Sequence, residues 1–287
     1  SVQMSRFFND GEGAFSIGYT HQNIDMICSM QSSTSHSNYG KCPASDFQYR
    51  SASRSIYETE HRLFATLSST HYFFGPESPT TFNLFFERKS GLPGTLSFDT
   101  YSSPGRYQTQ GFGHERRTND DSAQLLYIPS GVDDPLVCWV SCTTPNLAVA
   151  GEILELLYNT YGLSNYAGQI IPPGAFEFPY QTTLDLKITQ VLPGFRDDDE
   201  FVISLAIENL LNLLDNNEGE IFYGDYTGKI PVLDFSLTSD LSKYIYGNSR
   251  GPDYAYGYNP NDPYDLSKSA VNSIWRAQLG FTYKFSL

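Results

Sequence analysis

The feature that most constrains this chain is a two-residue alternation of apolar and polar side chains. In one segment, Leu184, Leu186 and Ile188 alternate with polar residues at 185, 187 and 189. Because successive side chains of a β-strand point to opposite faces, this alternation predicts a strand with one apolar and one polar face. The same pattern recurs in 15–20, 63–68, 201–208 and 279–287. We therefore expect an all-β protein built from antiparallel strands.

Alternation alone fits a soluble β-sandwich as well as a transmembrane β-barrel, since both have one apolar and one polar face. Two further features favour the barrel. The polar positions are mostly Gly, Ser and Thr, and aromatic residues such as Tyr19 and Tyr283 stand near strand ends. Aromatic girdles at both interfaces are typical of membrane barrels. The sequence therefore favours an antiparallel transmembrane β-barrel.

The connections between the expected strands alternate in length. Segments 75–79 and 193–199 are rich in turn residues and short, whereas the polar stretches 29–60, 99–135, 140–180 and 240–270 are long. Short turns at one end and long loops at the other are typical of outer-membrane barrels. A soluble domain rarely holds several irregular loops of about 30 residues.

One short loop helix is expected within the third long stretch. Thr144 is a plausible N-cap, Pro145 suits the first helical position, and Gly162 suits the position after the helix. An apolar stripe runs between them, from Leu147 to Tyr161. We place this helix in an extracellular loop that caps the barrel mouth, although a helix packed on a soluble sheet fits the segment equally well.

Composition limits the partners. Charged residues make up 17% of the chain, against about 25% in an average soluble domain, and aromatic residues make up 15%. The formal net charge of −14 argues against nucleic acid and against docking on anionic lipid. No segment has the roughly 18 apolar residues of a transmembrane helix, and no signal peptide is visible. The chain starts at Ser1 without Met, and we expect a fragment of a longer protein.

Several stretches resemble Oar-like TonB-dependent receptors, and they occur in the family's order from residue 57 to the end. Residues 57–67, YETEHRLFATL, resemble the family's PHR-x-x-A-S-L strand, with Glu60 in place of the usual Pro. Residues 80–93, TTFNLFFERKSGLP, resemble the next strand and its SGRPYS element, with Leu92 in place of Arg. Segment 119–129 resembles the GNDLLYVP loop, and 184–195 resembles LDLRLSQ followed by PGF. Segments 208–214 and 275–285 resemble the N-L-x-N-L-L-N and closing W-R-x-Q-L-G-x-R-Y-x-F strands.

The resemblance implies that residues 1–287 are one partial receptor domain without a plug. It implies the C-terminal portion of a 22-stranded barrel, of which this chain has room for about 9–11 strands. The implied function is energy-coupled transport of a large substrate, such as a peptide, protein, glycan or chelate, across the outer membrane of a Gram-negative bacterium. The implied partners are outer-membrane lipid, the TonB complex through the missing N-terminal part, and the barrel assembly machinery. An unknown extracellular substrate completes this set, and neither enzymatic activity nor a cofactor is expected.

If these strands belong to a barrel, each has a lipid-facing and a lumen-facing side, and individual residues can be assigned to one or the other. The residues expected to face lipid and to carry the assembly signal are Trp275, Phe281, Tyr283, Phe285 and Leu287. The residues expected to face the lumen are Asp185, Lys187, Thr189 and Lys284. Barrels of this family usually end on an aromatic residue, whereas here Ser286 and Leu287 follow Phe285, so we expect a weaker assembly signal.

Four cysteines, an even number, suit an oxidising compartment. Their spacing favours disulfides Cys28–Cys42 and Cys138–Cys142, although three connectivities are possible and a metal site at the second pair is an alternative.

The five histidines are scattered, and no catalytic motif is present. The segment 114–117 is a charged loop tip, and His61-Arg62 is expected to be structural. We predict no metal site, although the oxygen-rich segment 259–265 could bind Ca²⁺ and the acidic turn 197–200 could bind a cation. Tyr-rich residues from 244 to 264 could stack on peptides or glycans.

Two other functions remain open. A passive outer-membrane porin or adhesin would share the barrel but lack a plug. A secreted carbohydrate-binding β-sandwich would be soluble without detergent.

Overall fold

The computed structural model describes most of the chain, and the fold is mainly antiparallel β-sheet. The described residues are 1–28, 50–99, 125–196, 198–222, 229–237, 244–246 and 271–285, with the short pieces 33, 38 and 42–44. Within these residues, no helix is both long and apolar enough to cross a membrane.

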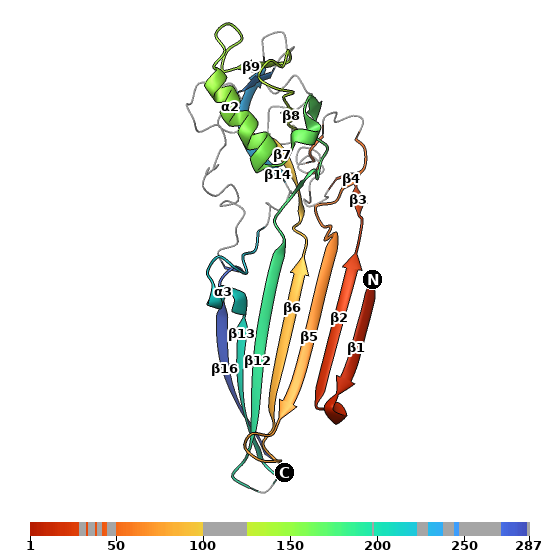
Figure 1. Ribbon diagram of the computed structural model, residues 1–287, viewed down its shortest axis with the longest axis vertical. Helices are drawn as coiled ribbons and strands as arrows, with labels where there is room; N and C mark the ends of the chain where they lie inside the picture. Colours follow the sequence, from red (N-terminus) through yellow and green to blue (C-terminus); the bar gives the residue numbers. More distant parts are fainter. Residues whose placement is uncertain are drawn as a thin grey trace.

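The main element is a seven-stranded antiparallel sheet in which neighbouring strands follow one another in chain order (Figure 1). Its strands, in spatial order, are β1 (Val2–Phe8), β2 (Gly13–His21), β5 (His61–His71), β6 (Thr80–Lys89), β12 (Gln181–Pro193), β13 (Glu200–Glu208) and β16 (Arg276–Lys284). The segments expected from alternation lie in these strands, except that 279–287 runs past the end of β16, and 286 and 287 lie outside the described residues. Strands β1 and β16 are the two edges, so the sheet is open.

Short and long connections lie at opposite ends of this sheet, as the sequence predicts. The short ones are the 3-10 turn η1 (Asn9–Gly11) and the connections 72–79 and 194–199. Gly75 has φ +109°, a conformation that favours glycine, and its carbonyl accepts a hydrogen bond of 3.0 Å from the N–H of Ser78. The long connections, 22–60, 90–180 and 209–275, leave from the other end.

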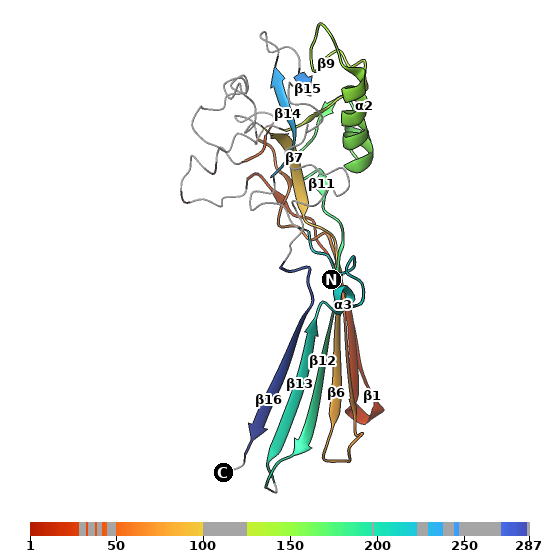
Figure 2. The same ribbon diagram turned by 90° about the vertical axis from the view of Figure 1, so that its left-hand side faces the viewer.

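The long connections form a second body, which we call the head, beyond one end of the main sheet (Figure 2). Its five-stranded sheet has the order β11 (Phe176–Glu177), β7 (Pro93–Asp99), β14 (Lys229–Leu237), β15 (Tyr244–Tyr246) and β9 (Val137–Trp139). Strands β14 and β7 are parallel, and so are β15 and β9. The expectations of irregular loops and of purely antiparallel pairing are therefore wrong for the head.

Smaller elements complete the molecule. They are β3 (Asp25–Met26), β4 (Ser53–Arg54), β8 (Tyr127–Ile128), β10 (Gln169–Ile170), helix α2 (Leu147–Glu155), π-helix η3 (Leu156–Thr160), 3-10 turn η4 (Ser164–Tyr166) and α3 (Leu210–Leu214). The structure joins Cys28 to Cys42 and Cys138 to Cys142, the two pairs that the spacing favours.

The hydrophobic core lies in the head. Its buried cluster is built from residues between Leu96 and Phe178, with Leu157 and Trp139 at its centre. The indole N–H of Trp139 donates to the carbonyl of Val132 over 2.7 Å, so this buried ring has its polar atom satisfied. The head is therefore a packed unit, in contrast to the open main sheet.

Helix α2 begins two residues later than the sequence suggested. Its N-cap is Asn146, whose side-chain oxygen accepts from the N–H groups of Ala148 and Val149. The prediction of Thr144 as N-cap is wrong because the Asn146 side chain takes that role. The helical stretch continues through η3, and Gly162 follows it with φ +67°, so the predicted end is confirmed.

The main sheet has seven strands in the described residues, fewer than the nine to eleven expected. The described parts of 90–180 and 209–275 instead contribute strands β7 to β11, β14 and β15, which lie outside the main sheet. In the described residues the sheet does not close into a barrel, and a total of 22 strands finds no support there.

Candidate functional site

One face of the main sheet is a continuous apolar surface. The strand registers align apolar residues into rows that cross the sheet, because directly paired residues point to the same face. The first row is Phe15, Leu67, Leu84, Leu186 and Ile207, the second is Ile17, Ala65, Phe86 and Leu184, and the third is Phe82, Ile188, Leu205 and Leu279.

This apolar face is largely free of charge and partly open to solvent. In the described strands it carries no Asp, Glu or Lys; Arg6 lies in the edge strand β1 and Arg88 at the end nearest the head. Leu279 and Phe281 are 59% and 62% exposed. Exposed apolar patches of this extent mark sites that contact a partner or a membrane.

Aromatic residues stand near both ends of this face on β16. Trp275 precedes the strand at the end nearest the head, and Tyr283 lies near the short turns. The hydroxyl of Tyr283 donates to the carboxylate of Asp199 and accepts from the N–H of Phe195. Phe201 and Phe281 stack with ring centroids 6.2 Å apart. Phe281 and Tyr283 share the apolar side of β16. Trp275, just before the strand, and Phe285, just beyond it, are 43% and 63% exposed.

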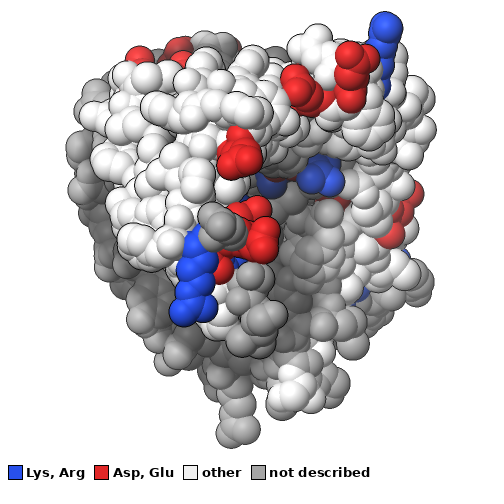
Figure 3. All heavy atoms as spheres, turned by 90° about the horizontal axis from the view of Figure 1, so that it is seen from below, with Lys and Arg blue, Asp and Glu red and all other residues white. Residues whose placement is uncertain are grey.

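The opposite face of the sheet is polar. The registers put Asp185, Lys187, Thr189 and Lys284 on it. Asp185 and Lys187 line a groove of about 370 Å³, together with residues of β2, β5, β6 and β13. Viewed from the turn end, charged side chains gather around a hollow, and a broad adjoining surface carries few charges (Figure 3).

Ion pairs connect neighbouring strands on this polar face. Arg62 lies 2.6 Å from Glu87, Arg276 lies 3.0 Å from Glu208, and Lys284 lies 2.9 Å from Glu200. Because these pairs are partly or fully exposed, each contributes little stability in water. They show that the charges of the sheet are concentrated on one side, which is the distribution that a wall between lipid and a polar interior requires.

Two asparagines organise the end of β13, within the stretch that resembles the N-L-x-N-L-L-N element. The side chain of Asn209 donates to the carbonyls of Gly219 and Ser273. Its backbone N–H donates to the carboxylate of Asp185 over 2.8 Å. Asn212 accepts from the N–H of Trp275 over 3.3 Å. These bonds fix the chain that enters β16, which sequence alone did not show.

A half-buried arginine with its carboxylate partners joins the head to the sheet. Arg54 of β4 pairs with Glu58 at 2.5 Å, with Glu60 at 2.8 Å and with Glu177 of β11 at 2.9 Å. Burial opposes ionisation of Glu58, but the N–H of Ile24 and the Arg54 guanidinium outweigh it and lower the pKa of this carboxyl. Glu58, which is only 2% exposed, is therefore held as a carboxylate. Sequence reasoning missed this cluster, because Glu177 comes from a segment far along the chain from residues 54–60.

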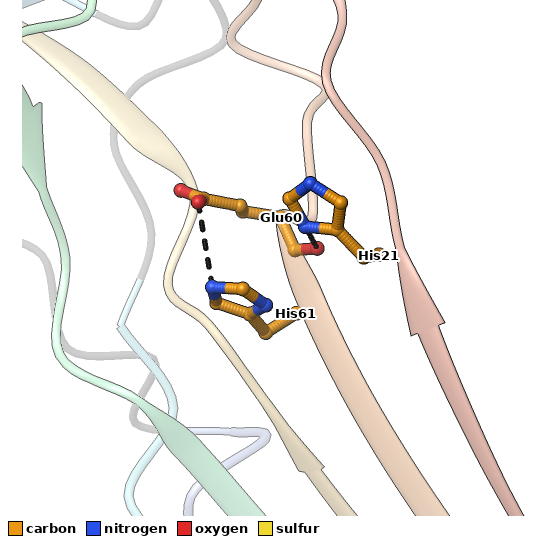
Figure 4. Close-up of side chains that lie close together, drawn as sticks. All are labelled: His21, Glu60 and His61. Atoms are coloured by element: carbon orange, nitrogen blue, oxygen red, sulfur yellow. Dashed lines mark hydrogen bonds and ion pairs between the residues drawn. The ribbon is translucent and has the colours of Figure 1, made fainter. Parts of the chain in front are cut away.

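One group of side chains in the described residues has the composition and spacing to hold a metal ion. It consists of His21 at the end of β2, and Glu60 and His61 at the start of β5 (Figure 4). The sequence view of the histidines as scattered is wrong for this pair, because His21 is the register partner of His61. A long connection separates the two strands, so the pairing becomes visible only when the register is known.

The remaining candidates lie partly outside the described residues. Leu287 and the segments 114–117 and 259–265 are outside them, and so is Asp197. Tyr244 and Tyr246 lie in β15. Asp198 and Asp199 belong to the short connection between β12 and β13, and Glu200 is the first residue of β13.

No family model matches this chain, and the same holds for the curated proteins and the solved structures with which it was compared.

Proposed function

We propose that the main sheet is part of the wall of an outer-membrane β-barrel, with its apolar face in lipid and its polar face toward the lumen. The observation that carries this proposal is the pairing of an apolar face, which has no Asp, Glu or Lys in the described strands, with a charged opposite face across seven antiparallel strands. In lipid, only helices and closed barrels satisfy their backbone polar groups. The open edges β1 and β16 would therefore pair with further strands.

The dimensions of the sheet agree with a membrane wall. A transmembrane strand needs about 9–11 residues, and β5, β6 and β16 have 11, 10 and 9. Trp275 and Tyr283 are eight positions apart, about 26 Å at about 3.3 Å per residue. The apolar band of outer-membrane barrels is about 25 Å tall and is bordered by aromatic residues.

The more specific proposal is the C-terminal barrel portion of an Oar-like TonB-dependent receptor. Its support is the ordered resemblance from residue 57 onward. In this proposal the plug lies outside the chain, the head collects a large extracellular substrate, and import or export is driven through the TonB complex. No covalent chemistry is part of this function.

A passive porin or adhesin is the alternative that shares the same wall. Asp185 and Lys187 would then face a permanent water-filled channel. The sequence encoding the residues that precede Ser1 decides between the two, because a plug domain with a TonB box is required for a receptor and missing from a porin.

A soluble β-sandwich is less consistent with the structure. A sandwich packs a second sheet against the apolar face of the first. Here the second sheet belongs to the head, which lies beyond the end of the main sheet and not over its face (Figure 2). The apolar face would therefore remain in water.

The test compares two adjacent residues of β6 that point to opposite faces, in the full gene product expressed in a Gram-negative host. Leu84→Arg puts a cation on the apolar face, and Asn83→Arg puts the same cation on the polar face. An arginine on the lipid face costs about 2–4 kcal/mol near the middle of the bilayer. We expect Leu84→Arg to reduce the protein recovered in the outer membrane and its heat-modifiable gel migration, with Asn83→Arg close to the unsubstituted protein. Equal behaviour of the two variants, or a protein that is monomeric in plain buffer, would refute the barrel.

A further inference from the structure

We propose that His21, Glu60 and His61 form a binding site for a divalent first-row transition-metal ion, with Zn²⁺ as the representative case. The three side chains offer one ligand atom each, and these atoms all lie within 4.8 Å of one another. Two imidazoles and one carboxylate are a common ligand set for Zn²⁺, with a fourth position left for water.

The spacing of two of the ligand atoms already suits a metal. Nε2 of His61 lies 3.3 Å from Oε1 of Glu60. Two ligands bound at about 2.0–2.1 Å in a tetrahedral site are about 3.4 Å apart. A cation placed between these atoms therefore requires little movement of either side chain (Figure 4).

The rest of the surroundings hold the two rings in place. The hydroxyl of Tyr19 lies 2.8 Å from Nδ1 of His61, so the other nitrogen of this ring is the one turned to Glu60. Nδ1 of His21 lies 3.2 Å from the carbonyl oxygen of Glu60, and the two imidazoles stack with centroids 5.1 Å apart. Metal-binding histidines usually use their second nitrogen in such a hydrogen bond, which orients the ring.

The charges around the group favour a divalent cation. Arg54 faces three carboxylates, those of Glu58, Glu60 and Glu177. With the imidazoles neutral, this cluster carries two more negative than positive charges. The Arg54 guanidinium donates a hydrogen bond of 2.8 Å to Oε2 of Glu60, whereas Oε1 of the same carboxylate faces His61. The guanidinium and a metal ion would therefore use different oxygens of Glu60.

The site lies where a bound metal ion could cross-link separate parts of the fold. His21 and His61 end β2 and begin β5 at the end of the sheet nearest the head, and Glu60 links them to Arg54 and through it to β11. His21 is exposed, and Glu60 and His61 are half-buried, so an ion can reach all three. A bound ion would therefore tie two sheet strands to the base of the head.

The experiment measures Zn²⁺ binding by isothermal titration to the full chain, folded in detergent and carrying no histidine tag. We expect one Zn²⁺ per chain and a loss of affinity of at least about tenfold in each of His21→Ala, His61→Ala and Glu60→Gln. Co²⁺ provides a second readout, because an ordered site with nitrogen and oxygen ligands gives a visible absorption spectrum that titrates to one equivalent and disappears in the same variants.

His71→Ala is the matched control, since His71 lies at the opposite end of the same strand and is also exposed. It should bind Zn²⁺ like the unsubstituted chain. Circular dichroism of each variant identifies any loss of fold, and Glu60→Gln keeps the test valid if a histidine variant fails to fold. No Zn²⁺ binding by the unsubstituted chain, or an equal loss in His71→Ala and His61→Ala, would overturn the proposal. Neither result would affect the proposed membrane wall, which is tested on β6.

Discussion

At the scale of single residues, Asp134 is the polar side chain on which the head depends most clearly. It is buried, and its carboxylate accepts four hydrogen bonds, from the Tyr127 hydroxyl, the Ser130 N–H and hydroxyl, and the Leu136 N–H. The amide of Asp134→Asn keeps one oxygen and turns the other acceptor into a donor. We expect the free energy of unfolding of the head to fall by about 1–3 kcal/mol, as when a buried partner is left unsatisfied.

The measurement follows the fluorescence of Trp139, the buried indole of the head, during chemical unfolding in a Trp275→Phe background. Asp133→Asn is the control, since Asp133 is adjacent and exposed, and it should change the midpoint little. An Asp134→Asn midpoint equal to that of Asp133→Asn would show that the four hydrogen bonds add nothing.

The same residue makes the stability of the head depend on pH. Burial opposes the ionisation of Asp134, but the N–H groups of Ser130 and Leu136 and the two hydroxyls outweigh it and lower its pKa below the ordinary value of 3.8. A carboxyl with a lowered folded-state pKa adds stability above its unfolded pKa and loses it as pH falls through the folded value. We therefore expect the melting temperature of the head to fall below pH 4, and to fall less in Asp134→Asn. The Trp139 signal between pH 7 and pH 2 tests this, and parallel curves for the two proteins would contradict it.

Residue-level prediction from sequence succeeded where a local rule applies. Two-residue periodicity separates Lys187 from Leu186 without any knowledge of the fold. It could not find the His21–His61 pair, because this contact depends on strand register across a connection of 39 residues. It could not find the Arg54–Glu177 pair either, because these two residues are far apart in the chain. Asp134 gave no signal either, since two of its four hydrogen bonds come from backbone N–H groups, which every residue carries.

At the scale of elements, the caps of α2 show how a boundary is decided. Thr144 and Asn146 are both good N-cap residues by type. In the folded chain the Asn146 side chain makes the capping bonds, and its own N–H donates to the carbonyl of Trp139. The helix was predictable from its apolar stripe, whereas its first residue depended on that contact with β9.

Asn146→Ala should therefore destabilise the head by about 1 kcal/mol, because the N–H groups of Ala148 and Val149 lose their acceptor. Thr144→Ala should have a much smaller effect. Chemical unfolding followed by Trp139 fluorescence compares the two, and a larger effect of Thr144→Ala would mean that the cap lies where the sequence suggested.

Strand pairing was more predictable from the sequence in the main sheet than in the head. Each strand of the main sheet pairs with its neighbour in chain order within that sheet. Alternation and turn length therefore indicated its antiparallel strands, although not their number or the open edges. In the head, β7 pairs with β14 in parallel although more than 120 residues separate them, and β9 pairs with β15 in the same way. Such pairings carry no local signal, and periodicity along the chain cannot predict them.

At the scale of the whole molecule, the two open edges are the central consequence of the proposed barrel. Strands β1 and β16 each have a neighbour on one side only among the described residues. In an antiparallel strand, alternate backbone N–H groups point to opposite sides, so each edge strand has one set of bonded amides and one outward set. Unpaired amides cannot remain in lipid, because each unsatisfied backbone group there costs several kcal/mol.

This requirement predicts the exchange behaviour of those outward amides in the full gene product reconstituted in lipid. If further strands pair with β1 and β16 and close the barrel, both sets of amides in each edge strand should exchange slowly, as in the central strand β6. Hydrogen exchange read by mass spectrometry or NMR at single-residue resolution measures this, with the exposed turn 72–79 as the fast reference. Alternation of slow and fast amides along β1 and β16 in the membrane-bound protein would mean that the edges are open to water and that the sheet is not part of a closed wall.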